Sequence, residues 1–478
     1  MSAIPAQSIP AAYPWSAGFR TLADEHDYRV DEIDGRVPAA LRGTLFRNGS
    51  GRNDRDGEWF PHWFDGDGMI SAIRFDDEGV RYRNRYVRTE SYLDETKAPP
   101  IMHRGFGKMR KGGVLANAFR QPGNVSNTSV VPNGEKLLSL WEGGPPYGLD
   151  PDTLATLGIE DFGGKVKAFS AHPKLDPRTG ELFNFGIDYG RKTTLTPYRI
   201  RNGELTRFAP VTLPYAVMNH DFVLTESYLV FCLGPILVNP LKMMLGLASF
   251  DGALHWDGGR PTLILLLRRD GTGAPRFIET DAFFQFHFAN GFEAEGSLVL
   301  DLTRYADYET IGDRLRNYWR SDWAAAGMAA LVRLRVDLST GKVSGRSYGT
   351  GTANEFPRIN PQRVASRHRY AYIANNSPER TTGLQQRITR VDLESGVTTF
   401  HDFGPSSFVG EPVFVPARAG GEEDEGFVIT LTYDAADGRS KIVGLDARDL
   451  AAKPLFIAAL RHHVPFSLHG CFVPRRGG

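Results

Sequence analysis

The stretches Val336-Asp337-Leu338-Ser339-Thr340-Gly341 and Val391-Asp392-Leu393-Glu394-Ser395-Gly396 share one pattern, and this pattern decides the fold. Each starts with an apolar residue that ends a strand, continues with an aspartate, and closes with a glycine. In a tight hairpin the aspartate accepts hydrogen bonds from the turn backbone, and glycine takes the positive φ that the turn requires. Leu175-Asp176-Pro177-Arg178-Thr179-Gly180 is an earlier copy, and residues 445–449 form a degenerate one.

The regular spacing of these turns predicts a repeated unit. The aspartates at positions 337, 392 and 446 are separated by 55 and 54 residues, and the step from 176 to 337 is close to three such units. Repeats of roughly 40–50 residues with several strands are typical of propeller blades. An array of β-sandwiches is the alternative, but the constant period favours an all-β, seven-bladed β-propeller. Loops and short helices are expected to form a dome over the face that carries the site.

One domain is predicted for residues 21–478, preceded by an irregular N-terminal arm over residues 1–20. Frequent glycine, proline and aromatic residues favour short strands over helix bundles. The clearest helical patterns cover Leu241–Leu245 and Asp313–Met328.

The composition excludes several classes of protein. Lysine plus arginine equals aspartate plus glutamate, at 56 each, and a nucleic-acid-binding protein would need a basic surplus. Two cysteines cannot make a disulfide scaffold and indicate a reducing cytoplasm. Residues 1–14 lack the pattern of a signal peptide, and no run approaches about 18 apolar residues. A cytoplasmic protein is therefore expected.

Four histidines that follow one another at blade-like intervals form the candidate site: His172, His220, His287 and His469. Their gaps of 48, 67 and 182 residues correspond to about one, one and three blades. Because the inner strands of all blades point at one axis, the four side chains can meet there and bind a metal ion. Taken singly, each of these histidines could be structural or exposed rather than a metal ligand. The same holds for the other histidines of the chain.

The chemistry of the donor set favours iron. Imidazole suits zinc, copper, iron and nickel, but four imidazoles would close a tetrahedral zinc site. An octahedral ferrous ion with four neutral ligands keeps two positions free and can bind O₂. Ligating histidines also need a carboxylate on the second ring nitrogen. Glu142, Glu355 and Glu411, each flanked by apolar, glycine or proline residues, are the candidates.

Other catalytic motifs are missing. The sequence shows no Gly-x-Ser-x-Gly elbow, Walker loop, dinucleotide-binding glycine motif or His-Glu-x-x-His. Asp65-Gly66-Asp67-Gly68 lacks the downstream glutamate of a calcium loop and is interpreted as a turn into a strand over Met69–Phe75.

The chain resembles the carotenoid cleavage oxygenases, and most of all the bacterial apocarotenoid oxygenases. The resemblance runs along nearly the whole chain. It is carried by segments such as Phe46-Arg47-Asn48-Gly49, Leu140-Trp141-Glu142-Gly143-Gly144, Ser170-Ala171-His172-Pro173, Glu355-Phe356-Pro357-Arg358 and Gly410-Glu411-Pro412-Val413-Phe414. Two departures, Phe288 after the third histidine and Cys471-Phe472 after the fourth, touch no ligand position.

The resemblance implies a seven-bladed propeller with one Fe²⁺ ion held by the four histidines and supported by the three glutamates. It implies that the methyl group of Thr128 crowds one open iron position. The implied reaction cleaves a conjugated C=C bond with O₂ to give two carbonyls, which balances without NADH or a flavin. Trp141, Phe286 and Phe288 are expected to contact the substrate.

The substrate class follows from Trp141. A stilbene-cleaving branch resembling this family has a lysine at that position, which binds the substrate phenol; a tryptophan cannot neutralise a phenolate. An apocarotenoid-type polyene is therefore favoured. Stilbenes or phenylpropenes, such as isoeugenol or 4-vinylguaiacol cleaved to vanillin, are the alternative, and a propeller that binds a ligand without oxygenase activity is the third.

Residues 235–247 predict a short apolar helix, with Asn239 as N-cap, Pro240 at the first helical position and Gly246 after the end. If exposed, such a helix can dip into a bilayer and place the protein on the inner face of a membrane. Packing on a neighbouring blade or subunit is the alternative.

Overall fold

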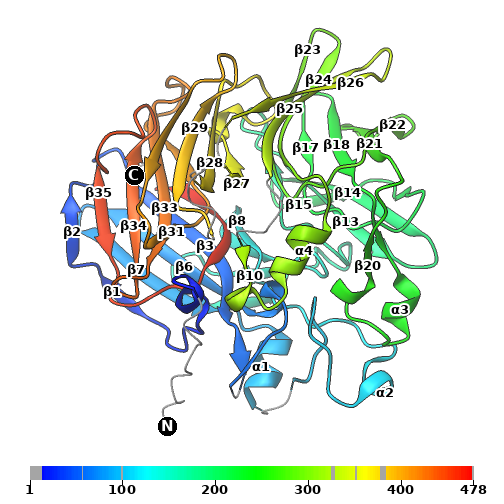
Figure 1. Cartoon of the computed structure of the whole chain (residues 1–478), viewed down its shortest axis with the longest axis horizontal. Helices are drawn as coiled ribbons and strands as arrows, with labels where there is room; N and C mark the ends of the chain where they lie inside the picture. The colour runs from blue at the N-terminus through cyan, green and yellow to red at the C-terminus, as the bar shows by residue number, and fades with distance from the viewer. Residues whose placement is uncertain are drawn as a thin grey trace.

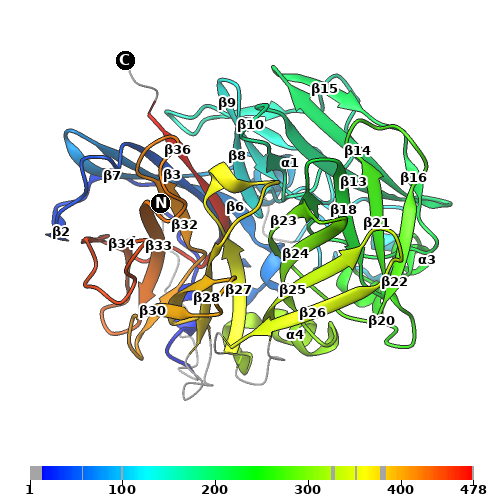
Figure 2. The ribbon, with the colours of Figure 1, turned by 90° about the horizontal axis from the view of Figure 1, so that it is seen from above.

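A computed structural model describes residues 13–55, 57–97, 101–323, 329–349, 352–376 and 384–475. Within these ranges, seven antiparallel sheets of four to six strands stand around one axis as the blades of a β-propeller (Figures 1 and 2). The predicted all-β fold is confirmed.

The first and seventh blades join the two ends of the chain. The first holds β1 (Asp27–Arg29), β7 (Gly79–Tyr86), β6 (Asp67–Asp76), β3 (Gly43–Arg52) and β36 (Ser467–Pro474), in that spatial order. The seventh holds β2 (Glu32–Gly35), β35 (Phe456–Ala459), β34 (Arg439–Asp446), β33 (Gly426–Asp434), β31 (Ser407–Val409) and β32 (Val413–Pro416). N-terminal strands thus pair with C-terminal ones in both blades, which closes the ring.

The other five blades follow the chain in order. The second holds β8 (Ser129–Asn133), β9 (Lys136–Leu140), β10 (Tyr147–Leu149) and β11 (Thr156–Ile159). The third holds β12 (Lys174–Leu175), β13 (Leu182–Tyr189), β14 (Thr193–Arg201), β15 (Glu204–Arg207) and β16 (Val211–Thr212). The fourth holds β17 (Val223–Leu224), β18 (Tyr228–Leu233), β21 (Thr262–Arg268) and β22 (Arg276–Thr280). The fifth holds β23 (Phe288–Ala294), β24 (Ser297–Arg304), β25 (Ala330–Asp337) and β26 (Val343–Tyr348), and the sixth β27 (Thr352–Arg358), β28 (Tyr370–Asn376), β29 (Arg387–Asp392) and β30 (Thr398–Asp402).

The repeated aspartate turns are the predicted hairpins. In the β25–β26 turn, the Asp337 side chain accepts from the backbone N–H groups of Ser339 (2.9 Å) and Thr340 (2.8 Å). Gly341 closes that turn with φ of 74°. The β29–β30 turn has the same arrangement at Asp392 and Gly396. The turns at Asp337, Asp392 and Asp446 thus follow β25, β29 and β34 in three consecutive blades, and their period is the period of the blades. The turn at Asp176 lies between β12 and β13, only two blades before that of Asp337, so the predicted step of three units from 176 to 337 is wrong.

Short helices cover one end of the propeller: α1 (Glu90–Lys97), α2 (Gly113–Asn117), α3 (Pro240–Met244) and α4 (Glu309–Leu315). In Figure 1, α1 and α2 lie at the bottom, α3 at the lower right and α4 near the middle of the view. The chain also forms two small two-stranded ribbons, β4 (Asp54–Arg55)–β5 (Glu58–Trp59) and β19 (Ile236–Val238)–β20 (Leu254–Trp256). Among the described helices, none combines the length and apolar character needed to cross a bilayer.

Two expectations about local structure need correction. The helix expected over Asp313–Met328 is instead α4, which ends at Leu315, followed by a 3₁₀ turn over Tyr318–Arg320; Asn317, with φ of 49°, separates them. Residues 324–328 lie outside the described ranges. In the expected arm, residues 1–12 are also outside them, but Trp15 and Phe19 are fully buried. Residues 13–20 are thus packed into the core and are no loose arm.

Candidate metal centre

The four predicted histidines come together on the propeller axis. His172, His220 and His287 lie in the segments that lead into the innermost strands β12, β17 and β23, and His469 lies within the innermost strand β36. Each histidine contributes one ring nitrogen, and these four nitrogens all lie within 4.8 Å of one another. Side chains up to 297 positions apart (172 to 469) therefore form one cluster.

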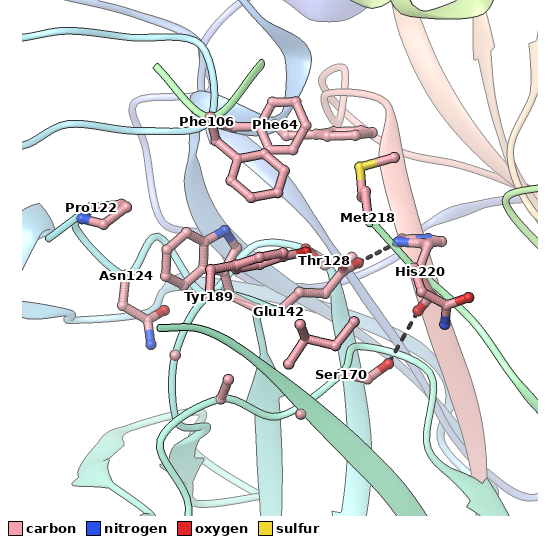
Figure 3. Close-up of a pocket in the computed structure, with 18 of the residues that line it drawn as sticks. Phe64, Phe106, Pro122, Asn124, Thr128, Glu142, Ser170, Tyr189, Met218 and His220 are labelled. Carbon is pink, nitrogen blue, oxygen red and sulfur yellow. Dashed lines mark hydrogen bonds and ion pairs between the residues drawn. The ribbon is translucent and has the colours of Figure 1, made fainter. Parts of the chain in front are cut away.

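Backbone anchors set the positions of these segments. The Ser170 hydroxyl donates to the His220 carbonyl (3.2 Å), which ties the third blade to the fourth (Figure 3). The buried Asp221 carboxylate accepts from the Phe288 N–H (2.9 Å) and pairs with Lys174 (2.7 Å). Three consecutive blades are thus joined directly beside the histidines.

The spacing of the ring nitrogens matches an octahedral ion. The Nε2–Nε2 distances are 2.8 Å for His172–His220, 3.2 Å for His220–His287 and 3.1 Å for His287–His469. Ligands at right angles on bonds of about 2.1 Å would be about 3.0 Å apart, and tetrahedral ligands about 3.4 Å. The His220 and His469 rings are the most separated pair, with centroids 6.3 Å apart against 4.3–5.1 Å for the others. The four rings are thus unevenly spread, with His220 and His469 furthest apart.

Each of the three predicted glutamates meets one histidine at Nδ1. Glu355 accepts from His287 (2.6 Å), Glu411 from His469 (2.9 Å), and Glu142 from His220. A proton held on Nδ1 leaves the Nε2 lone pair free and aimed at the centre.

The three carboxylates differ in their surroundings. Glu142 faces the cavity, and its side chain is 32% exposed. Glu355 also accepts from the Tyr305 hydroxyl (2.6 Å). Glu411, whose side chain is 2% exposed, forms an ion pair with the buried Arg47. Of these three glutamates, Glu411 is the one that forms an ion pair with a buried cation among the described residues.

Burial and neighbouring carboxylates shift the pKa values of three of the histidines. Burial lowers the pKa of His172 well below its usual value, and His220 lowers it further. Burial likewise lowers the pKa of His469 to about 3, against the opposing effect of Glu411. For His220, burial would lower the pKa, but the Glu142 carboxylate outweighs it and the pKa is raised. Neutral imidazoles are the form that binds a metal.

The Glu411 carboxyl is held ionised. Burial alone would raise its pKa, but Arg358, His469 and Arg47 together hold the pKa well below the usual range. Four imidazoles, three of them bonded to carboxylates, thus form a donor set that fits a divalent ion preferring nitrogen ligands, such as Fe²⁺.

A cavity of about 1450 Å³ opens from the histidines. Trp141, Phe286 and Thr128 line it, and their roles towards substrate and iron stay predictions. The Thr128 hydroxyl donates to Asn127 (3.2 Å), and the Thr128 carbonyl accepts from the His469 N–H (3.1 Å). Figure 3 shows Thr128 beside the Glu142–His220 pair, with Phe64 and Phe106 on another side of the cavity.

Phe288 does not line this cavity. Its side chain is buried among core residues of the fourth and fifth blades, including Val223 and Leu302. In a regular strand, residues two positions apart point to the same side. Phe286 lies in a bend and β23 begins only at Phe288, so this rule does not apply to the pair. The predicted substrate contact of Phe288 is therefore wrong.

Two residues of the site were not predicted from the sequence. Tyr305 lines the cavity and donates to Glu355, and the buried Arg47 donates to the Leu468 carbonyl (2.9 Å) next to His469. Phe46-Arg47-Asn48-Gly49 stood out as a motif, but no spacing rule connects Arg47 to Glu411, 364 residues later.

The fold and the site define a β-propeller with a four-histidine centre for a nitrogen-preferring metal ion. A family model for retinal pigment epithelial membrane protein (RPE65) matches residues 19–474. The chain therefore belongs to this family, which is the carotenoid cleavage oxygenase family that its motifs resemble.

Three relatives cover almost the whole chain. This chain is 35% identical to the apocarotenoid-15,15'-oxygenase of Synechocystis sp., over 98% of this chain and 97% of the relative. It is 30% identical to carotenoid 9,10(9',10')-cleavage dioxygenase 1 of Pisum sativum (98% and 90%) and to isoeugenol monooxygenase of Pseudomonas putida (92% and 94%). A crystal structure of cobalt-substituted Synechocystis apocarotenoid oxygenase matches with a TM-score of 0.90 at 34% identity, over 97% of this chain and 98% of that one.

Proposed function

We propose that this protein is an Fe²⁺-dependent dioxygenase that cleaves a conjugated C=C bond of an apocarotenoid-type polyene. The observation that carries the proposal is the convergence of four histidine ring nitrogens within 4.8 Å of one another beside a large cavity. His172, His220, His287 and His469 would hold the ion, and Glu142, Glu355 and Glu411 would fix the rings.

The bound ferrous ion supplies a site where O₂ and the alkene are brought together. The chain's own residues do the rest. The Nδ1–H groups of three histidines donate to carboxylates, which would hold the rings with their Nε2 atoms towards the ion. Thr128 would restrict one open position with its methyl group, which favours one arrangement of the two reactants. Each alkene carbon gains one oxygen atom of O₂, so the products are two carbonyls and no external reductant is consumed.

The cavity favours a long apolar substrate. At about 1450 Å³ it exceeds the roughly 300–1,000 Å³ of pockets for drug-sized ligands. A phenylpropene would fill little of that volume. Trp141 and Phe286 offer apolar surface to a substrate in the cavity. Position 141 carries a tryptophan and not the lysine that would bind a phenolate. The phenylpropene alternative keeps some support, because isoeugenol monooxygenase is as similar to this chain as the plant dioxygenase.

An exposed apolar patch beside the cavity supports uptake from a lipid phase. It consists of Val114, Leu115, Phe119, Leu241, Met244 and Leu247, from α2, α3 and the residues after them. Leu115 and Phe119 are 94% and 73% exposed. Exposed Arg120 and Lys242 lie among them and would meet anionic headgroups. The segment 235–247, of which α3 covers Pro240–Met244, would thus contact a membrane peripherally. A cytoplasmic location stays a prediction.

The patch is held in a fixed shape. The buried Arg104 guanidinium donates to carbonyls on both helix segments, those of Asn117 (3.1 Å) and Met243 (2.9 Å). The Phe119 N–H donates to the Met244 carbonyl (2.7 Å). Vesicle flotation tests the membrane contact: Leu115→Ser/Leu241→Ser should release the protein from anionic vesicles. Leu157→Ser, at an exposed leucine of the outer strand β11, is the control; equal binding of all variants would contradict this contact.

Iron loading and oxygen consumption test the activity. Metal-free protein titrated with Fe²⁺ should bind about one ion per chain and consume O₂ when an apocarotenal is added. His287→Ala should keep the fold, seen as an unchanged circular dichroism spectrum, and lose both iron and O₂ consumption. Full activity of metal-free protein would refute the proposal, and no O₂ consumption with any alkene would favour a binding protein.

A further inference from the structure

The lining of the cavity has two parts, which we call its two branches. The first lies at the helices and comprises Phe106, Met243, Met244 and Phe250, together with the cations Arg104 and Arg120. The second comprises Gly143 and Gly144 of the second blade and residues of β13 and β14 of the third blade. Glu142 and Ser170 connect the second branch to His220.

Four cations line the second branch: Lys165, Lys167, Arg191 and Arg207. All four side chains are exposed to solvent at this end. Lys165 donates to the Leu205 carbonyl (3.3 Å), and none of the four has a carboxylate partner among the ion pairs of the described residues. We call these four residues the basic rim.

One carboxylate accompanies the basic rim. Apart from Glu142 and Glu355 at the histidines, Asp188 is the one acidic residue among the described residues that line the cavity. The wall also carries Thr194, Thr196 and Tyr198, alternate residues of β14 that share one face. The Tyr198 hydroxyl lies over Gly186, where an added Cβ would be 3.2 Å from it. This end of the cavity is thus polar and positively charged, with hydroxyl groups facing the cavity.

We propose that the basic rim binds the carboxylate of an amphipathic polyene, so that the preferred substrate is an apocarotenoic acid. This inference rests on the proposed alkene cleavage. The apolar side chains of the first branch would hold the hydrocarbon end, because the Arg104 guanidinium there is already bonded to backbone carbonyls. The distance from the basic rim to the histidines would select the double bond that is cleaved. O₂ gives one oxygen atom to each carbon of that bond, the carboxylate is unchanged, and the products are one apolar aldehyde and one aldehyde-acid.

Steady-state kinetics with three substrates test the proposal: an apocarotenoic acid, its methyl ester and the corresponding alcohol. Kinetics with the wild type should show a kcat/KM for the acid above that for the ester. In the double variant Lys167→Ala/Arg207→Ala, kcat/KM for the acid should fall about tenfold because KM rises, as expected for the loss of two exposed charge contacts. The kcat/KM for the ester should not change. Lys192→Ala, an exposed lysine next to Arg191 that does not line the cavity, should leave all three substrates unaffected.

Binding separates this inference from the proposed function. Trp63, Trp141 and Trp323 line the cavity, so quenching of tryptophan fluorescence reports ligand binding without turnover. Tighter binding of the acid than of the ester, lost in the double variant and weakened by salt, would support the basic rim as the anchor. Equal affinities for acid and ester would overturn it, even if both are cleaved. Selective acid binding without cleavage of any substrate would instead refute the proposed function alone.

Discussion

Replacing Glu411 by glutamine should destabilise the metal-free protein strongly. Glutamine still accepts a hydrogen bond from His469 Nδ1, but it leaves Arg47, with a side chain 1% exposed, without its buried counter-ion. Removing one partner of a buried ion pair costs about 3–5 kcal/mol. With an unfolding entropy of about 2.1 cal/mol/K per residue, a chain of this length should lose about 3–5 °C in melting temperature.

Glu142→Gln is the matched control. It also removes a carboxylate from a histidine Nδ1, but the Glu142 side chain is 32% exposed and has no buried cation beside it. Its melting temperature without metal should change by less than about 1 °C, as for most exposed charge changes. Both variants should lose about 10–100-fold in iron affinity, the usual cost of removing a partner of a ligating histidine.

Thermal melts by circular dichroism, with and without Fe²⁺, and chelator competition for iron would measure these effects. Glu411→Gln and Glu142→Gln are expected to differ in stability and to agree in iron affinity. Equal melting temperatures for the two metal-free variants would refute the assignment of Glu411 as the counter-ion of Arg47. Unchanged iron affinity in both would refute the support that the carboxylates give to the histidines.

Further predictions concern a buried histidine and a tyrosine. Burial lowers the pKa of His62 to about 4, so the unfolded chain takes up a proton first, and stability falls as pH drops from about 6.5 towards 4. His62→Asn keeps an acceptor for the Phe64 N–H and should flatten this loss, by up to about 1.4 kcal/mol per pH unit, in melts between pH 7 and 4. Tyr305→Phe removes a donor to Glu355 and should lower the melting temperature by about 2 °C. An unchanged pH dependence of stability in His62→Asn would contradict the buried neutral His62. An unchanged melting temperature in Tyr305→Phe would contradict the hydrogen bond from Tyr305 to Glu355.

The propeller could be predicted because its signal is local and repeated. Each copy of the aspartate–glycine turn, such as Asp337 to Gly341, forms its own hydrogen bonds within a few residues. The period of the turns is therefore visible in the sequence without any knowledge of long-range contacts. The helix capped by Asn239 was predictable for the same reason: the cap bond to the Lys242 N–H spans one turn.

The parts that were missed depend on distant contacts or on register. Tyr305 becomes part of the site only because its hydroxyl reaches Glu355, 50 positions further along the chain. Phe288 was misplaced because the chain bends at Phe286, before β23 begins, and the Phe288 side chain is buried in the core. The helix expected to continue to Met328 is interrupted at Asn317, whose left-handed conformation no propensity argument demands.

Labelling with ¹⁸O₂ tests the central claim most directly. Iron-loaded protein, an apocarotenoic acid and ¹⁸O₂ are mixed, and the products are reduced at once to alcohols so that exchange with water is prevented. Mass spectrometry should find one ¹⁸O atom in each of the two products, because each alkene carbon receives one atom of the same O₂. Label in one product alone would contradict a dioxygenase, and its absence from both would contradict oxygen-dependent cleavage altogether.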